Sequence, residues 1–187
     1  MAARDARARR LKLTAAACCC GVILALGYPA LAVADPERDL RVATRALSFL
    51  DHRPSGDMPV AVVYAAGDSA SEDHARRMAD AMGDGGPQGR IRLVPTLMAA
   101  DELGALDRQE AVLIADGLSD DQAMEVFSAA SRRGLITIAS DMACVDAGHC
   151  VMAVASEPRV QIVVSRDAAR ESDVGFASSF RMMITER

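Results

Sequence analysis

Apolar residues along the chain fall into two patterns, short continuous runs and stripes with helical spacing. Continuous runs of four or five apolar positions predict buried strands, because parallel strands covered on both faces are apolar throughout. These runs are residues 60–64, 91–94 (stopped by Pro95), 111–115 and 135–139. Stripes with helical spacing predict helices at residues 35–51, 69–82, 99–106 and 119–133. The regular alternation of strand and helix predicts a parallel sheet.

Polar residues at the ends of the helical stretches support these boundaries. Ser119 precedes Asp120 and Asp121, which is typical of a helix start, and Gly134 is typical of a helix end. At the other long helix, Ser69 and Ser71 are alternative N-caps. Both of these helices therefore begin a few residues after an expected strand.

The alternation changes after residue 150. Two strand-like runs, residues 151–155 and 160–164, are separated by only four residues, and so short a connection favours an antiparallel hairpin. The fold expected is α/β with three layers. It has a mainly parallel sheet, helices on both faces, and the antiparallel hairpin near the C-terminal edge.

The first 34 residues have the order of a secretory signal peptide. Five basic side chains precede an apolar stretch at residues 13–28, and Ala32-Val33-Ala34 provides the small residues of a cleavage site. The apolar stretch is shorter than the roughly 20 residues of a membrane span. We expect cleavage after Ala34 and a single periplasmic domain at residues 35–187, with no membrane insertion after cleavage.

Composition narrows the classes of function. The chain is 51% hydrophobic, 25% charged and 3% aromatic. Removing residues 1–34 from the 187-residue chain leaves 153 residues without lysine and changes the formal net charge from −5 to −9. This charge argues against a nucleic-acid partner, since phosphate contacts need clustered basic residues. A protein partner is the better expectation, and a homodimer is compatible with it.

Two of the five cysteines belong to the expected domain. Cys18, Cys19 and Cys20 leave with the signal peptide, so Cys144 and Cys150 remain as a pair. Export favours a disulfide between them. The alternative, a metal-binding pair, lacks two further ligands nearby apart from His149. We expect no metal and no cofactor.

Three carboxylates follow expected parallel strands. Asp68, Asp116 and Asp141 would all lie at the carboxyl ends of those strands, where open α/β sheets bind ligands. They are candidate ligand-binding residues, and the alternative is that they cap helices or close turns. The histidines His52 and His74 are expected at the surface.

The turn after the first strand raises a catalytic alternative. Gly67-Asp68-Ser69 resembles the nucleophile block of the SGNH hydrolases, and Asp146 with His149 matches that family's Asp-x-x-His. The chain contains no Asn, so the asparagine of that family's oxyanion hole has no counterpart. A strand–turn–helix cap is the favoured interpretation, and no catalytic residue is assigned.

The C-terminal segment carries large apolar residues at helical spacing. Phe176, Phe180, Met183 and Ile184 predict a last helix whose apolar stripe packs on the sheet. The alternative is an exposed stripe, which would form an adaptable partner surface.

The last third of the chain resembles the YfiR-like family of exported bacterial proteins. The resemblance rests on residues 133–141, Cys144-Val145, Gly148, residues 150–152 and 158–164, and Phe176, Phe180 and residues 181–184. It implies a periplasmic α/β domain with a structural disulfide between Cys144 and Cys150 and without catalysis.

The resemblance also implies a regulatory role. A YfiR-like domain would bind and repress the sensor part of an inner-membrane signalling protein, first a diguanylate cyclase and otherwise a histidine kinase. Cyclic di-GMP would then fall. Two other hypotheses remain open, a periplasmic small-ligand-binding sensory protein and an SGNH-like esterase. The partner's identity and any regulatory role of the disulfide do not follow from the residues.

Overall fold

A computed structural model describes residues 36–52, 54–84 and 90–187. The expected signal peptide and its cleavage site lie outside the described residues. All described residues belong to one compact unit, Ala32–Arg187. Within the described residues, no helix has the length and apolarity needed to cross a membrane.

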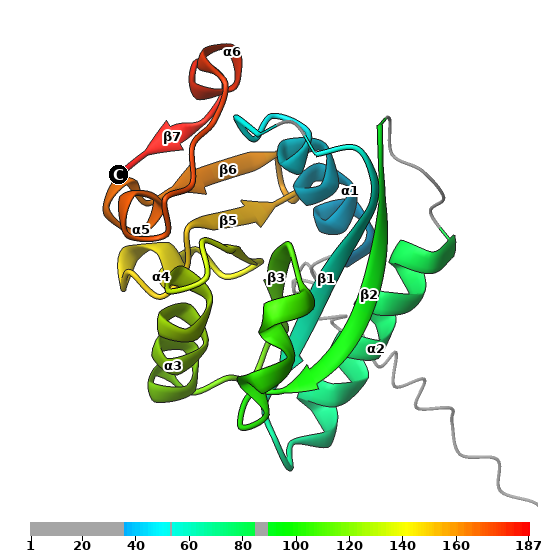
Figure 1. Cartoon of the computed structure of the whole chain (residues 1–187). Coiled ribbons are helices and arrows are strands. Elements are labelled where there is room, and N and C mark those ends of the chain that lie inside the picture. The colour runs from blue at the N-terminus through cyan, green and yellow to red at the C-terminus, as the bar shows by residue number, and fades with distance from the viewer. Residues whose placement is uncertain (1–35, 53, 85–89) are drawn as a thin grey trace, which may run out of the picture. The chain divides into compact units, whose positions relative to one another are not determined.

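The fold is α/β, as predicted, and is built on one seven-stranded sheet (Figure 1). The strand order is β2-β1-β3-β4-β5-β6-β7, and only β5 and β6 pair antiparallel. The bounds are β1 Gly56–Tyr64, β2 Ile91–Ala99, β3 Ala111–Ile114, β4 Ile136–Ala139, β5 Met152–Ala155, β6 Gln161–Val164 and β7 Thr185–Glu186. The predicted hairpin is therefore confirmed, and β7 lies outside it as the last strand of the sheet.

Helices and one 3₁₀ helix cover the two faces of the sheet. Their bounds are α1 Pro36–Leu47, α2 Ser69–Asp84, η1 Leu103–Arg108, α3 Asp120–Ser131, α4 Met142–Asp146, α5 Arg166–Glu171 and α6 Ser178–Arg181. In Figure 1, α1 and α2 lie on one side of the sheet, and α3 lies on the other. This is the three-layer arrangement expected from the sequence.

Alternate residues of the central strands face opposite layers, as strand geometry requires. In β1, Val60 and Val62 belong to one core cluster, whereas Ala61 and Val63 belong to the other. All four side chains are fully buried. Burial on both faces explains why this strand is a continuous apolar run.

The prediction that Pro95 ends the second strand is wrong. Strand β2 continues through Pro95 to Ala99 and pairs parallel with β1 along its whole length. β2 is an outer strand, and proline is tolerated there because its missing N–H can face away from the neighbouring strand. The expected helix at 99–106 is replaced by the 3₁₀ helix Leu103–Arg108.

The helix ends follow the predicted polar residues in part. The Ser119 hydroxyl accepts a hydrogen bond from the N–H of Gln122, whose side chain accepts one from the N–H of Ser119, so α3 begins with a capping box. At α2 neither predicted serine is the cap. The Asp68 carboxylate accepts hydrogen bonds from the N–H groups of Ala70 (2.9 Å) and Ser71 (3.3 Å) instead.

Candidate functional site

Cys144 and Cys150 form a disulfide that closes a short loop. Cys144 belongs to α4 and Cys150 lies two residues before β5, and their Cα atoms are 5.6 Å apart, an ordinary disulfide separation. Cys150 is completely buried. Residues 36–52, 54–84 and 90–187 contain no cluster of three or more His, Cys, Asp or Glu side chains that could hold a metal. The disulfide therefore links α4 covalently to the segment that leads into β5.

The three candidate carboxylates lie after β1, β3 and β4, at one end of the sheet. We call Asp68, Asp116 and Asp141 with their turns the crest. Two of them are helix caps. Asp68 caps α2, as described above, and the Asp141 carboxylate accepts a hydrogen bond of 2.9 Å from the N–H of Ala143 at the start of α4. Each carboxylate thereby satisfies a helix amide that otherwise has no intrahelical partner.

Asp116 has a different set of partners, which connects three elements. Its Oδ1 accepts a hydrogen bond of 2.9 Å from the Ser140 hydroxyl after β4. Its backbone N–H donates to Nδ1 of His74 in α2 at 3.0 Å, and its Oδ2 lies 3.3 Å from the same nitrogen. The His74 side chain is 12% exposed, so the prediction of a surface histidine missed a half-buried residue.

The residues of the esterase hypothesis have separate places in the fold. Ser69 is an exposed residue in the first turn of α2, and His149 lies within the disulfide loop. Among the residues that the structure describes, no hydrogen bond joins the Ser69 hydroxyl to a histidine. The Asp116 carboxylate accepts its hydrogen bond from Ser140, not from Ser69. This geometry lacks the serine–base hydrogen bond that nucleophile activation uses.

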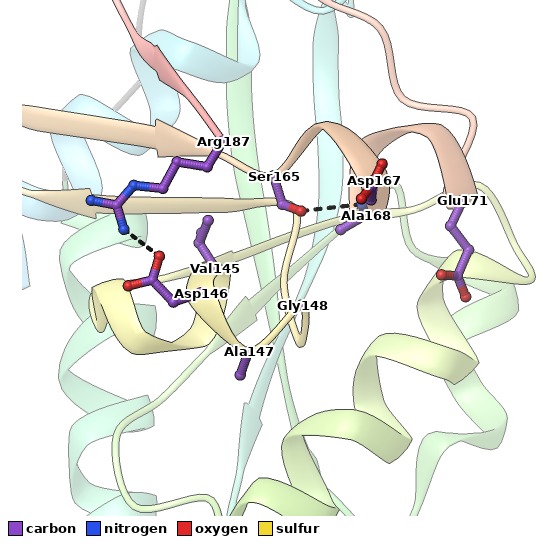
Figure 2. Close-up of a pocket in the computed structure, with 9 residues that line it drawn as sticks. All are labelled: Val145, Asp146, Ala147, Gly148, Ser165, Asp167, Ala168, Glu171 and Arg187. Carbon is purple, nitrogen blue, oxygen red and sulfur yellow. Dashed lines mark hydrogen bonds and ion pairs between the residues drawn. The ribbon is translucent and has the colours of Figure 1, made fainter.

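A hollow of about 380 Å³ lies beside the disulfide loop (Figure 2). Val145, Asp146, Ala147 and Gly148 come from that loop, α5 and the residue before it contribute Ser165, Asp167, Ala168 and Glu171, and Arg187 follows β7. Arg187 and Asp146 form an ion pair at one end of the hollow, and Glu171 lies at the other. The hollow thus has an ion pair at one end and the Glu171 carboxylate at the other, with small residues between them.

The C-terminal residues hold β7 against the sheet by several bonds. The N–H of Arg187 donates to the carbonyl of Val164 at 2.9 Å, and the carbonyl of Arg187 accepts from the N–H of Arg166 at 2.8 Å. The Arg181 guanidinium donates two hydrogen bonds to the Glu186 carboxylate, at 2.8 and 3.2 Å. These bonds lower the pKa of Glu186 and raise the pKa of Arg181.

The candidate C-terminal stripe is divided between core and surface. Phe176 and Phe180 are 8% and 2% exposed, and Ile184 packs partly buried against the same core. Phe180 stacks on Phe49 with ring centroids 5.1 Å apart. Met183 points outward instead and is 63% exposed, and its neighbour Met182 is 84% exposed. Three of the four candidate residues therefore pack against the core, and the fourth, Met183, lies at the surface.

The predicted long C-terminal helix is only one turn, Ser178–Arg181. Phe176 lies before it, and forms an antiparallel bridge with Leu50. The backbone bonds of Ala177 to Phe49 (2.9 Å) and of Asp51 to Gly175 (3.0 Å) fix this segment beside the end of α1. The helical spacing of the apolar residues therefore arises from an extended bridge followed by a short turn.

No protein-family model and no curated protein sequence matches the chain. The chain is similar in structure to a conserved domain protein from Vibrio cholerae O1 biovar El Tor, with a TM-score of 0.58, 12% identity and 82% of this chain covered. It is also similar to an ABC domain from Streptococcus pneumonia in complex with L-Trp, with a TM-score of 0.59, 10% identity and 79% covered. The chain spans 60% and 61% of these two structures. The likeness concerns the α/β fold.

Proposed function

We propose that the chain is an exported regulatory binding protein without enzyme activity of its own. It binds the periplasmic sensor domain of an inner-membrane signalling protein and represses it. A diguanylate cyclase is the first candidate partner, and a histidine kinase is the second. The choice of partner rests on the YfiR-like residues of the last third of the chain.

The observation that supports a protein partner most strongly is the exposed apolar surface at the C-terminal edge. We define this edge as β6, β7, Val160 and residues 182–187. Val160, Met182 and Met183 are 58%, 84% and 63% exposed. β6 and β7 run parallel, with Val163 opposite Thr185. Val160 precedes β6 and the two methionines precede β7, so all three lie at the same end of the two strands. Flexible methionine side chains suit a surface that adapts to a partner.

Repression requires a preference for one state of the partner. A ligand that moves a two-state protein from almost all active to almost all inactive must bind the inactive state about 10⁴-fold more tightly. A few buried apolar side chains at the centre of an interface can supply much of such a difference. The methionine pair is the most exposed apolar group in the YfiR-like segment and, with Val160, can serve this purpose.

The test is the cyclic di-GMP content of the native host. Deleting the gene should raise cyclic di-GMP, and returning the wild-type gene should restore the original level. The Met182→Asp/Met183→Asp double variant should fail to restore it, although the protein is exported in equal amount. Met124→Asp is the matched control, since Met124 is an equally large apolar side chain in α3, 48% exposed.

Two results would count against this proposal. A deletion that leaves cyclic di-GMP unchanged would rule out the cyclase as partner. Phosphorylation of a membrane kinase, compared between the deletion strain and the wild type, then tests the second candidate. Equal restoration by the double variant and by Met124→Asp removes the methionine pair from the interface. N-terminal sequencing of the exported protein should begin at Asp35.

A second candidate function is the binding of a small polar ligand. It is favoured by the hollow of about 380 Å³ with Arg187 and Asp146 at one end and Glu171 at the other. The Streptococcus structure with a similar fold was obtained in complex with L-Trp. An amino acid bound here would place its ammonium group at Glu171 and its carboxylate at Arg187, in exchange for the ion pair with Asp146. The crest carboxylates are the alternative place for a ligand.

Thermal shift with a panel of free amino acids, L-Trp included, tests this candidate. A compound that binds only the folded protein raises the unfolding midpoint as its concentration passes the Kd. Glu171→Gln should abolish the shift if the hollow is the site, and Asp68→Asn should abolish it if the crest is. No shift with any compound would contradict this second candidate.

A further inference from the structure

The half-buried imidazole of His74 joins α2 to the turn between β3 and α3. The backbone N–H of Asp116 donates a hydrogen bond of 3.0 Å to Nδ1 of His74. A nitrogen that accepts a hydrogen bond carries no proton, so the neutral ring has its proton on Nε2. The bond therefore exists only while Nδ1 is unprotonated.

The same nitrogen faces a second group of the same residue. Oδ2 of Asp116 lies 3.3 Å from Nδ1, close enough to accept a hydrogen bond after a small movement. When the ring takes up a proton, Nδ1 becomes a donor and can no longer accept from the amide. Attraction between the imidazolium and the carboxylate then favours the new bond.

We infer that His74 is a pH-sensitive switch for the crest. At neutral pH it accepts from the Asp116 amide, and at acidic pH it donates to the Asp116 carboxylate. The exchange alters the turn between β3 and α3 and adds one positive charge, on His74, beside the crest.

Tight packing transmits the exchange to the neighbouring turns. Gly117 has φ +97°, and a Cβ built on it would lie 3.1 Å from Cβ of Ser71 and 3.3 Å from Oδ2 of Asp68. The turn thus touches the capped start of α2 directly. On its other side the Asp116 carboxylate accepts from the Ser140 hydroxyl, next to the Asp141 cap of α4.

Other charged groups lie at this end of the sheet. Asp68 faces the turn from the start of α2, and Asp73 and Arg77 flank His74 on α2 itself. Asp101 and Glu102 follow β2 at the same end of the sheet. Asp116 is the only one of these groups with a described contact to the ring.

The test is an NMR titration of the whole exported protein between pH 8 and pH 4.5. The amide proton of Asp116 should shift with the same midpoint as the His74 ring signals. In His74→Gln this amide should lose that transition. His149→Gln is the matched control and should keep it, because His149 lies in the disulfide loop away from this contact. Asp116→Asn keeps the amide and a partner for Ser140, and should lower the His74 midpoint.

The wild-type titration alone decides the inference even if a variant fails to fold. An Asp116 amide whose shift does not follow the His74 ring would overturn it. The same holds if His74→Gln leaves the transition of that amide intact. An unchanged His74 midpoint in Asp116→Asn would show that the carboxylate does not receive the proton, and would also overturn the switch.

Discussion

The crest and the C-terminal edge are both rich in charged residues, but different forces hold them. At the crest, Asp68 and Asp141 cap the helices that directly follow them in the chain. At the C-terminal edge, β7 is held by ion pairs and backbone bonds to residues far away in sequence, such as Asp146 and Val164. The edge also leaves Met182 and Met183 exposed. Local caps therefore hold the crest, and the edge, with its exposed apolar side chains, is the better candidate for contact with a partner.

The largest expected effect on stability comes from truncating a buried side chain of the C-terminal segment, and an exposed side chain of the same segment provides the comparison. Phe180→Ala should lower the free energy of unfolding by about 3–4 kcal/mol, because it removes a buried ring that stacks on Phe49 and packs at a tilt against Phe176. Met183→Ala should change it by less than about 0.5 kcal/mol, since exposed side chains contribute little. Urea unfolding measures both values. Equal losses in the two variants would contradict the division between core and surface.

Reduction of the disulfide should have the next largest effect. Opening a loop this short should cost about 2 kcal/mol by the chain-entropy estimate. The loss should be local. Amide exchange should accelerate in the disulfide loop and at the Arg187 contact with Asp146, while the crest caps of α2 keep their protection. An unfolding midpoint that is the same in oxidised and reduced protein, with the bond verified beforehand, would contradict this.

A smaller effect tests the cap at the crest. Asp68→Ala should cost about 1 kcal/mol, because two N–H groups at the start of α2 lose their acceptor. Ser69→Ala should be nearly neutral, since the cap is its neighbour. Thermal unfolding compares the two variants. A larger loss of stability in Ser69→Ala than in Asp68→Ala would contradict this assignment and favour Ser69, which the sequence predicts as a cap.

The smallest effect concerns the exposed pair at the edge. The pKa of Glu186 is lowered by its hydrogen bonds to Arg181, so its contribution to stability is present above the pKa of the unfolded chain. This contribution is lost as the pH falls through the lower, folded-state pKa. Glu186→Gln should remove that part of the acid dependence, measured by amide exchange of β7. Asp57→Asn, which breaks a similar pair with Arg92 at β1–β2, should leave β7 exchange unchanged.

Local sequence signals predicted most of the fold. The strands of the parallel part, the α3 capping box and the β5–β6 hairpin all follow from neighbouring residues. β2 is the exception, because its run of apolar residues does not indicate where the strand ends. Proline ends a strand only where its missing N–H is needed, and the position of a strand at the edge of a sheet depends on the whole topology.

The candidate sites were harder to predict because their contacts are long-range. Nothing near His74 in the sequence indicates Asp116, which is 42 residues away. The division of the C-terminal stripe depends on the bridge between Phe176 and Leu50, which is likewise a contact between distant segments. The sequence did place Asp68, Asp116 and Asp141 after parallel strands, since the carboxyl ends of such strands share one end of the sheet.

Site-specific crosslinking in the living host tests the central claim most directly. A photoreactive amino acid is placed at position 183 in one strain and at position 124 in another, both of which are exposed methionines. The account predicts that position 183 crosslinks to an inner-membrane protein with a periplasmic sensor domain, and that position 124 does not. No crosslink at position 183, or the same products at both positions, would contradict a regulatory partner at the C-terminal edge.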